Sequence, residues 1–238
     1  MVFRRESYPT RDCYPFNLPV FQNTPFLDLT APVTLFVGEN GTGKSALLEA
    51  IARRCRIHIW ANGGGSRLES NPYEDQLYRF IDVHWTQGEV PGSFFAAEIF
   101  RGFAELLDEF AETDRGQLDY FGGRSLLVQP HGQSLLSFFT ARYRIKGLYL
   151  LDEPETALSP RSPLRFVNLV GAMARAGHAQ FILCTHSPIL LASPGVTIYS
   201  LDHCPIQPVP FESTDHCRLY KSFMADPGRC LGDAGTQA

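Results

Sequence analysis

The segment TLFVGENGTGKSALLEA at residues 34–50 constrains the fold of this chain more than any other part of its sequence. It begins with an apolar run typical of a buried strand and ends with apolar residues at a helical spacing. Between them lies a glycine-rich turn that fits the pattern GxxxxGK(S/T) without a mismatch. The bare pattern arises by chance in roughly one chain in a hundred of this length, and the flanking strand and helix make chance rarer. The segment therefore predicts a phosphate-binding loop.

The residue types in this turn suit the capture of a nucleotide phosphate. Glycines let the backbone point its N–H groups at an anion, and the following helix adds the positive end of its dipole. Lys44 is expected to neutralise the β- and γ-phosphates, and the Ser45 hydroxyl to ligate Mg²⁺. The expected ligands are thus ATP and Mg²⁺. The predicted nucleotide-binding residues are Gly38, Asn40, Gly41, Thr42, Gly43, Lys44 and Ser45.

A second apolar strand, LYLL at 148–151, ends in the carboxylates of Asp152 and Glu153. A P-loop enzyme needs an acid to hold Mg²⁺ from the side opposite Ser45, so Asp152 is the predicted second metal ligand. Glu153 is placed to polarise the attacking water and is the predicted catalytic base. An acidic strand end is often only solvated, but its pairing with the phosphate loop makes the signal strong.

A third apolar strand, FILCT at 181–185, is followed by His186. We expect His186 to contact the γ-phosphate as a hydrogen-bond sensor and class it with the catalytic residues. A lone histidine at a strand end is more often structural. Its place after the two other motifs favours the functional interpretation.

Strands that alternate with helices predict an α/β fold with a mostly parallel sheet flanked by helices, plus antiparallel N-terminal strands. The chain of 238 residues suffices for one such domain, expected over 1–238 with a C-terminal extension at 202–238. Expected helices cover 45–57, 93–112, 134–144, 164–176 and 214–225. Expected extended segments are 14–36, interrupted by prolines, and 77–86, 147–151, 181–185 and 196–201.

Charge and hydropathy exclude some classes of function. The net charge of −4 argues against nucleic-acid binding by bulk charge. No apolar stretch approaches the roughly 20 residues that a membrane helix needs, and the first residues lack a secretion signal. We therefore expect a cytoplasmic protein without membrane insertion.

The six cysteines form no CxxC pair and are expected to be reduced thiols. The tripeptide Asp-His-Cys occurs twice, at 202–204 and 215–217. A zinc site is one interpretation, since histidine and cysteine are zinc ligands. The spacing matches no common zinc pattern, which favours coincidence. The ligands would be His203, Cys204, His216 and Cys217.

The order of the phosphate loop, LYLLDEPETALSP and FILCTHSP resembles the ATP-binding cassette class. It more closely resembles small bacterial ATPases with AAA-type domains and heads similar to those of SMC proteins. The resemblance covers most of the chain. It implies that the loop PHGQS at 130–134 is a signature loop, whose Gly132 and Gln133 reach the ATP of the other subunit in a dimer. It also implies that 156–159 is the D-loop and His186 the switch histidine.

The chain departs from the family pattern in two places. Pro130 stands where a cassette signature has serine, which removes a hydroxyl contact to the γ-phosphate. An arginine of the small family is absent from the segment FFAAE at 94–98. Either Glu98 or Gln87 is then expected to fill the Q-loop role of sensing Mg²⁺ and water. The alternative is that the candidate residue is only a solvated side chain on a helix.

The resemblance implies Mg²⁺-dependent ATP hydrolysis that drives an ATP-gated homodimer switch. The span between Lys44 and Gly132 is too short for a coiled-coil arm, so the chain is expected to be an ATPase head alone. Glu155 resembles the repair-like branch, which favours a protein partner in DNA repair or phage defence and leaves nucleic-acid association open. The alternatives are the ATP-binding subunit of a membrane transporter and a regulatory module that binds ATP without turnover.

Overall fold

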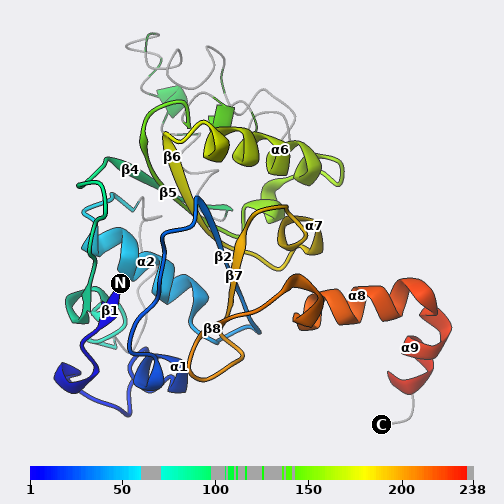
Figure 1. The fold of residues 1–238 in the computed structure, drawn as a ribbon, viewed down its shortest axis with the longest axis horizontal. Coiled ribbons are helices and arrows are strands. Elements are labelled where there is room, and N and C mark those ends of the chain that lie inside the picture. The colour runs from blue at the N-terminus through cyan, green and yellow to red at the C-terminus, as the bar shows by residue number, and fades with distance from the viewer. Residues whose placement is uncertain are drawn as a thin grey trace.

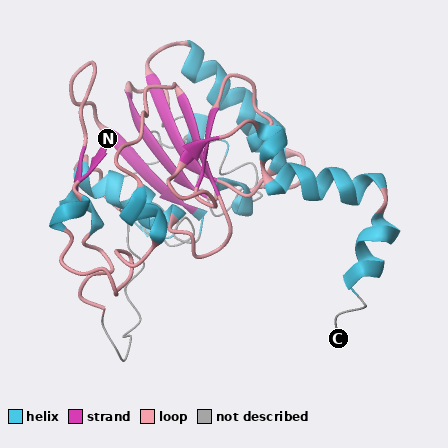
Figure 2. Cartoon of the chain, turned by 60° about the horizontal axis from the view of Figure 1, so that its bottom comes forward, coloured by secondary structure: helices cyan, strands magenta, loops and turns pink. Residues whose placement is uncertain are grey.

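The computed structural model describes residues 1–59, 71–97 and 143–234, together with 105, 107–109, 111, 116, 125, 136 and 138–140. Their main feature is a six-stranded sheet with helices on both faces (Figures 1 and 2). Neighbouring strands are parallel, except that β8 runs antiparallel to β7. This confirms the predicted α/β class with a mostly parallel sheet. The strand order is β4 (Gly92–Ala96), β5 (Gly147–Asp152), β6 (Ala179–Cys184), β2 (Val33–Val37), β7 (Thr197–Ser200) and β8 (Gln207–Pro208).

The central strand β2 is buried along its whole length because both faces of the sheet are covered. Phe36 packs on one face in a cluster with Leu47, Leu48 and Ile51 of helix α2 (Lys44–Arg54). Leu35 belongs to the cluster on the other face. Helices α6 (Ser162–Arg175) and α7 (Pro188–Leu191) cover that second face.

The smaller elements surround this sheet. Strand β1 (Val2–Phe3) pairs antiparallel with β3 (Ile81–Asp82), which confirms the predicted antiparallel N-terminal pairing. The C-terminal helices α8 (Asp215–Ala225) and α9 (Pro227–Ala234) project away from the body (Figure 1). No helix within the described ranges is long and apolar enough to cross a membrane. The remaining elements are helix α1 (Pro19–Asn23) and the 3₁₀ helices Arg5–Ser7, Leu77–Phe80, Pro154–Ala157 and Phe211–Ser213.

The expected helix at 93–112 is wrong at its start. Residues Gly92–Ala96 form β4, which pairs with β5 along the edge of the sheet. The adjacent rings of Phe94 and Phe95 are buried on opposite faces, and short apolar runs of this kind do not distinguish a strand from a helix by periodicity. Farther along, residues 105, 107–109 and 111 are helical, and the rest of 98–112 lies outside the described residues.

The expected extended segment at 14–36 also needs correction. It contains helix α1, and only Val33–Val37 forms a strand of the main sheet. Pro19 occupies the first turn of α1, a position where proline starts a helix instead of interrupting a strand. Likewise 77–86 is mostly not a strand, because a 3₁₀ helix precedes the two residues of β3.

Candidate active site

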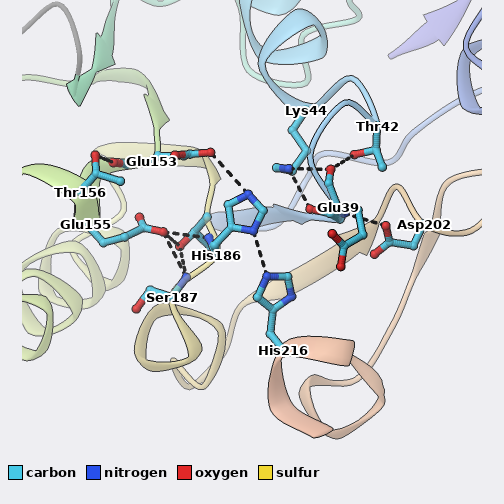
Figure 3. Close-up of polar contacts among 12 residues, drawn as sticks. Glu39, Thr42, Lys44, Glu153, Glu155, Thr156, His186, Ser187, Asp202 and His216 are labelled. Carbon is cyan, nitrogen blue, oxygen red and sulfur yellow. Dashed lines mark hydrogen bonds and ion pairs between the residues drawn. The ribbon is translucent and has the colours of Figure 1, made fainter. Parts of the chain in front are cut away.

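The parallel register brings the predicted motifs to one edge of the sheet. Cys184 at the end of β6 pairs with Phe36 of β2 on one side and with Asp152 of β5 on the other. The loop that follows β2, the acidic end of β5 and the segment after β6 therefore meet at the carboxyl ends of the strands (Figure 3). This is where open α/β sheets bind their ligands.

The phosphate loop is shaped by a helix that the sequence did not reveal. Gly43 has a φ of 99° and lies at the N-terminus of α2. A Cβ atom at this position would lie 2.7 Å from Leu18 Cδ1 and 2.9 Å from Phe21 Cζ. Helix α1 and the residue before it thus pack directly beneath the loop. Glycine is required here both by the backbone conformation and by this close approach.

Lys44 points into the loop that precedes it. Its Nζ donates to the carbonyl oxygens of Gly38 at 2.7 Å and of Glu39 at 3.1 Å, and its side chain is buried. Thr42 Oγ1 donates to the same Glu39 carbonyl at 2.9 Å (Figure 3). The buried ammonium places a positive charge inside the turn, and Asn40 and Gly41 are exposed at its tip.

Asp202 is a loop-supporting residue that sequence reasoning missed. Its Oδ1 accepts a hydrogen bond of 2.7 Å from the backbone N–H of Glu39. It follows β7, the strand that pairs with β2, so the two strand ends are adjacent. A carboxylate just after a strand was the available signal, but only the strand order reveals which loop it reaches.

Ser45 and Asp152 lie close together, as the predicted metal site requires. Burial raises the pKa of Asp152 to about 6, although the nearby Ser45 hydroxyl acts to lower it. In the described part of the chain, Asp152 Oδ1 is buried and has no hydrogen-bond partner. A hydroxyl and a carboxylate with an unpaired buried oxygen fit a hard divalent cation such as Mg²⁺.

Glu153 adopts a strained backbone conformation beside His186. Its φ of 44° lies in the left-handed region, which is uncommon for a residue other than glycine. The Glu153 N–H donates to the carbonyl oxygen of Cys184 at 3.0 Å, which ties β5 to β6. The side chain places Oε1 3.4 Å from Nε2 of His186, a close approach without hydrogen-bond geometry (Figure 3). Residues held in such conformations cluster at functional sites.

Glu155 fixes the loop that carries His186. Its Oε1 accepts hydrogen bonds from Thr185 Oγ1 at 2.7 Å, from the His186 N–H at 2.8 Å and from the Ser187 N–H at 3.1 Å. Ser187 in turn caps α7 by accepting from the N–H of Leu190. In the sequence Glu155 indicates only a branch of the family, so this structural role was missed.

We expect Glu155→Ala to lower the free energy of unfolding by about 2–3 kcal/mol, because it removes hydrogen bonds to an ionised acceptor. This corresponds to a melting temperature lower by about 4–12 °C. Thermal unfolding followed by circular dichroism measures the change. Glu155→Gln retains an oxygen acceptor and should lose less than half as much. An unchanged melting temperature for the alanine variant would contradict the role of Glu155.

The structure describes one of the two residues predicted for the Q-loop role, Gln87, and does not describe Glu98 or the signature loop. Gln87 lines a cavity of about 410 Å³ together with Gly147 and Gln180, at the amino ends of β5 and β6. It therefore lies at the sheet edge opposite the phosphate loop, which contradicts a Q-loop role for it. The predicted residues that lie outside the described part of the chain are Glu98, Pro130, Gly132 and Gln133.

The two Asp-His-Cys tripeptides have different partners. His203 Nδ1 lies 3.0 Å from Ser200 Oγ, and Cys204 Sγ donates to the carbonyl oxygen of Pro19. His216 instead places Nε2 2.9 Å from Nδ1 of His186 (Figure 3). Among the described residues, no group of three or more histidine, cysteine or acidic side chains is arranged to hold a metal ion. The structure thus gives the zinc interpretation no support.

Comparison with known proteins yields two family models and a set of solved structures. The model "AAA domain, putative AbiEii toxin, Type IV TA system" matches residues 125–192, and a second AAA-domain model matches residues 16–55. Among curated proteins, no sequence matches the chain.

Three of the similar structures illustrate the range of proteins found. A "putative metal-chelate type ABC transporter" is 18% identical, with 81% of this chain and 78% of the other covered and a TM-score of 0.48. The SMC head domain from Thermotoga maritima is 17% identical, with coverages of 77% and 92% and a TM-score of 0.43. The protein cbiO1 from Clostridium perfringens is 16% identical, with coverages of 84% and 87% and a TM-score of 0.46.

The family models cover two parts of the chain that carry the motifs. The first spans Asp152 and His186, and the second spans the phosphate loop with Lys44 and Ser45. These parts meet at the carboxyl edge of the parallel sheet. The two parts of the chain that match AAA-domain models thus together form one P-loop site at this edge.

Proposed function

We propose that this chain binds ATP with Mg²⁺, hydrolyses the nucleotide to ADP and phosphate, and closes into a homodimer while ATP is bound. The observation that carries the proposal is the convergence of Lys44, the Ser45–Asp152 pair and the Glu153–His186 pair at one edge of the sheet. A phosphate loop with a buried ammonium, a cation site and a carboxylate beside a histidine are the parts that phosphoryl transfer to water requires.

Binding is assigned to the loop and to the start of α2. The backbone N–H groups around Gly38 and Gly43 and the ammonium of Lys44 hold the phosphates. Ser45 and Asp152 would hold Mg²⁺, which supplies positive charge against the β- and γ-phosphate oxygens when it is bound. The loop residues Asn40, Gly41 and Thr42 complete the cradle.

Hydrolysis is assigned to Glu153 and His186. Glu153 orients the attacking water and accepts its proton as the water oxygen bonds to the γ-phosphorus and the bond to the ADP oxygen breaks. His186 donates a hydrogen bond to a γ-phosphate oxygen and thereby distinguishes ATP from ADP. Burial, followed by the charge of Lys44, lowers the pKa of His186, so the ring is neutral at pH 7.

Dimerisation rests on the exposed tip of the phosphate loop. Glu39, Asn40 and Gly41 are exposed, so the edge that would hold ATP is accessible to a second copy. We assign Gly132 and Gln133 to a second phosphate-binding surface that closes over the partner's ATP. The N–H groups of a glycine-containing loop suit this task, and a symmetric closure would hold two nucleotides.

The dimer is tested by light scattering on Glu153→Gln, which keeps ATP intact. We expect a mass near twice 26.6 kDa with ATP–Mg²⁺ and the monomer mass with ADP or without nucleotide. A monomer under all three conditions would contradict the proposal. A dimer under all three would show that surfaces other than the nucleotide site hold the copies together.

The process that the switch serves is proposed to involve a protein partner in DNA repair or phage defence. The description of the matched family model names a toxin of a Type IV TA system, which favours the defence role. An affinity purification with the Glu153→Gln variant and ATP tests this, because it traps the ATP-bound state. Recovery of membrane transport proteins alone would instead support the transporter alternative.

A further inference from the structure

His186 is contacted on both sides of its ring. Its Nε2 faces Glu153 Oε1 at 3.4 Å, and its Nδ1 lies 2.9 Å from Nε2 of His216 (Figure 3). His216 belongs to the first turn of α8, an element that the assigned machinery does not use. The contact therefore links the C-terminal extension to the nucleotide site.

The start of α8 holds His216 in place. Thr214 is buried and caps the helix, since its Oγ1 accepts from the N–H of Cys217 and donates to the carbonyl oxygen of Phe211. Beyond this first turn the helix projects into solvent, and all its residues from Arg218 to Ala225 are exposed. The first turn is thus the part of α8 that is anchored to the body.

Only one of the two rings donates in the bond between them. If His186 donated through Nδ1, its Nε2 would carry a lone pair facing the Glu153 carboxylate, and the two acceptors would repel each other. If His216 donates, the proton of His186 lies on Nε2 and faces that carboxylate. The close approach of Glu153 therefore favours His216 as the donor.

The tautomer matters for the role assigned to His186. The oxygens of a γ-phosphate are hydrogen-bond acceptors, so a neutral histidine contacts them only through a nitrogen that carries a proton. With its proton on Nε2, His186 presents a donor on the side of the nucleotide site. With its proton on Nδ1, it would present a lone pair and lose the contact.

We propose that His216 is a positioning residue for His186. The Nε2–H of His216 donates to Nδ1 of His186 and holds the His186 ring in the tautomer that carries its proton on Nε2. The inference deepens the proposed function, because it assigns a control of the switch histidine to the C-terminal extension. A partner that bound and displaced α8 would release this constraint and slow the ATPase. Which ring nitrogen carries the proton is generally set by the hydrogen bond of the other nitrogen.

The first test is spectroscopic and needs no activity. Two-bond ¹H–¹⁵N correlation spectra of histidine-labelled protein distinguish the two tautomers, and the His186 signals are assigned by their loss in His186→Asn. We expect the wild type to carry the proton on Nε2, and His216→Ala to show both tautomers in exchange. A wild-type His186 with its proton on Nδ1 would overturn the inference, and that result does not depend on whether His216→Ala folds.

The second test is kinetic. We expect His216→Ala to lower kcat about five- to tenfold, the effect of one ordinary hydrogen bond on an equilibrium, with the Kd for ATP unchanged because phosphate-loop contacts remain. His216→Gln supplies an amide N–H donor and should restore kcat to within about twofold. The matched control is His203→Ala, in the other Asp-His-Cys tripeptide, which should resemble the wild type.

The two tests separate the inference from the function on which it rests. If the wild type hydrolyses no ATP, the proposed function fails and the spectra still decide the tautomer. If hydrolysis occurs and His216→Ala changes neither the tautomer nor kcat, the positioning role is overturned while the ATPase assignment stands.

Discussion

Lys44→Ala is expected to raise the Kd for ATP–Mg²⁺ by at least about tenfold, because one charge-assisted contact to a buried phosphate contributes roughly 1.5–3 kcal/mol. The ammonium is buried and bonds to the carbonyl oxygens of Gly38 and Glu39, so it already lies within the loop. Alanine leaves the helix intact, since it has the highest helix propensity. The loss is therefore one of charge and hydrogen bonding at the phosphates.

Isothermal titration calorimetry with ATP–Mg²⁺ measures this affinity. The matched control is Lys146→Ala, which removes an exposed lysine beside β5 at the opposite edge of the sheet and should bind ATP like the wild type. Equal affinities for the wild type and Lys44→Ala would place the nucleotide elsewhere on the molecule.

The buried strands and the phosphate loop were predictable because their signals are local. Val33–Val37 and Gly147–Asp152 are apolar along their length, as strands covered on both faces must be. The phosphate-loop pattern also predicts the strand before it and the helix after it. Parallel pairing then requires that the ends of such strands meet at one edge, and for this reason the motifs alone predict that Asp152 lies near Ser45.

Segments whose conformation depends on distant packing were not predictable. The strand Gly92–Ala96 forms because β5 offers an unpaired edge, and its own sequence reads equally well as the start of a helix. Helix α1 is fixed by the burial of Phe21 beneath Gly43, a contact between residues far apart in the chain. Local propensity carries no information about such contacts.

The residues of the candidate site divide in the same way into those that local motifs predict and those that depend on distant contacts. The residues expected to touch phosphate or Mg²⁺ lie in motifs, whereas the residues that support them do not. Asp202 reaches the Glu39 N–H across 163 positions of sequence, and His216 reaches His186 from another helix. Their side chains are ordinary surface types in the sequence, so only the strand order and the docking of α8 reveal their roles.

Glu153→Gln is expected to reduce ATP hydrolysis at least about 100-fold, the low end of what a positioned base contributes. The substitution keeps the shape of the side chain and the backbone preference at a φ of 44°, so the fold should not change. The amide does not accept the proton of the attacking water, and hydrolysis slows for that reason. ATP binding should persist or strengthen, because a negative charge is removed from the side of the site that faces the γ-phosphate.

A phosphate-release assay at saturating ATP measures the rate, and calorimetry measures binding by the same protein. Glu212→Gln, at an exposed glutamate of the 3₁₀ helix Phe211–Ser213, is the matched control and should hydrolyse ATP at the wild-type rate. Loss of both binding and hydrolysis in Glu153→Gln would indicate a folding role for the strained residue. Hydrolysis at the wild-type rate would mean that the base lies elsewhere, and the 3.4 Å approach of Glu153 to His186 would then have only a structural meaning.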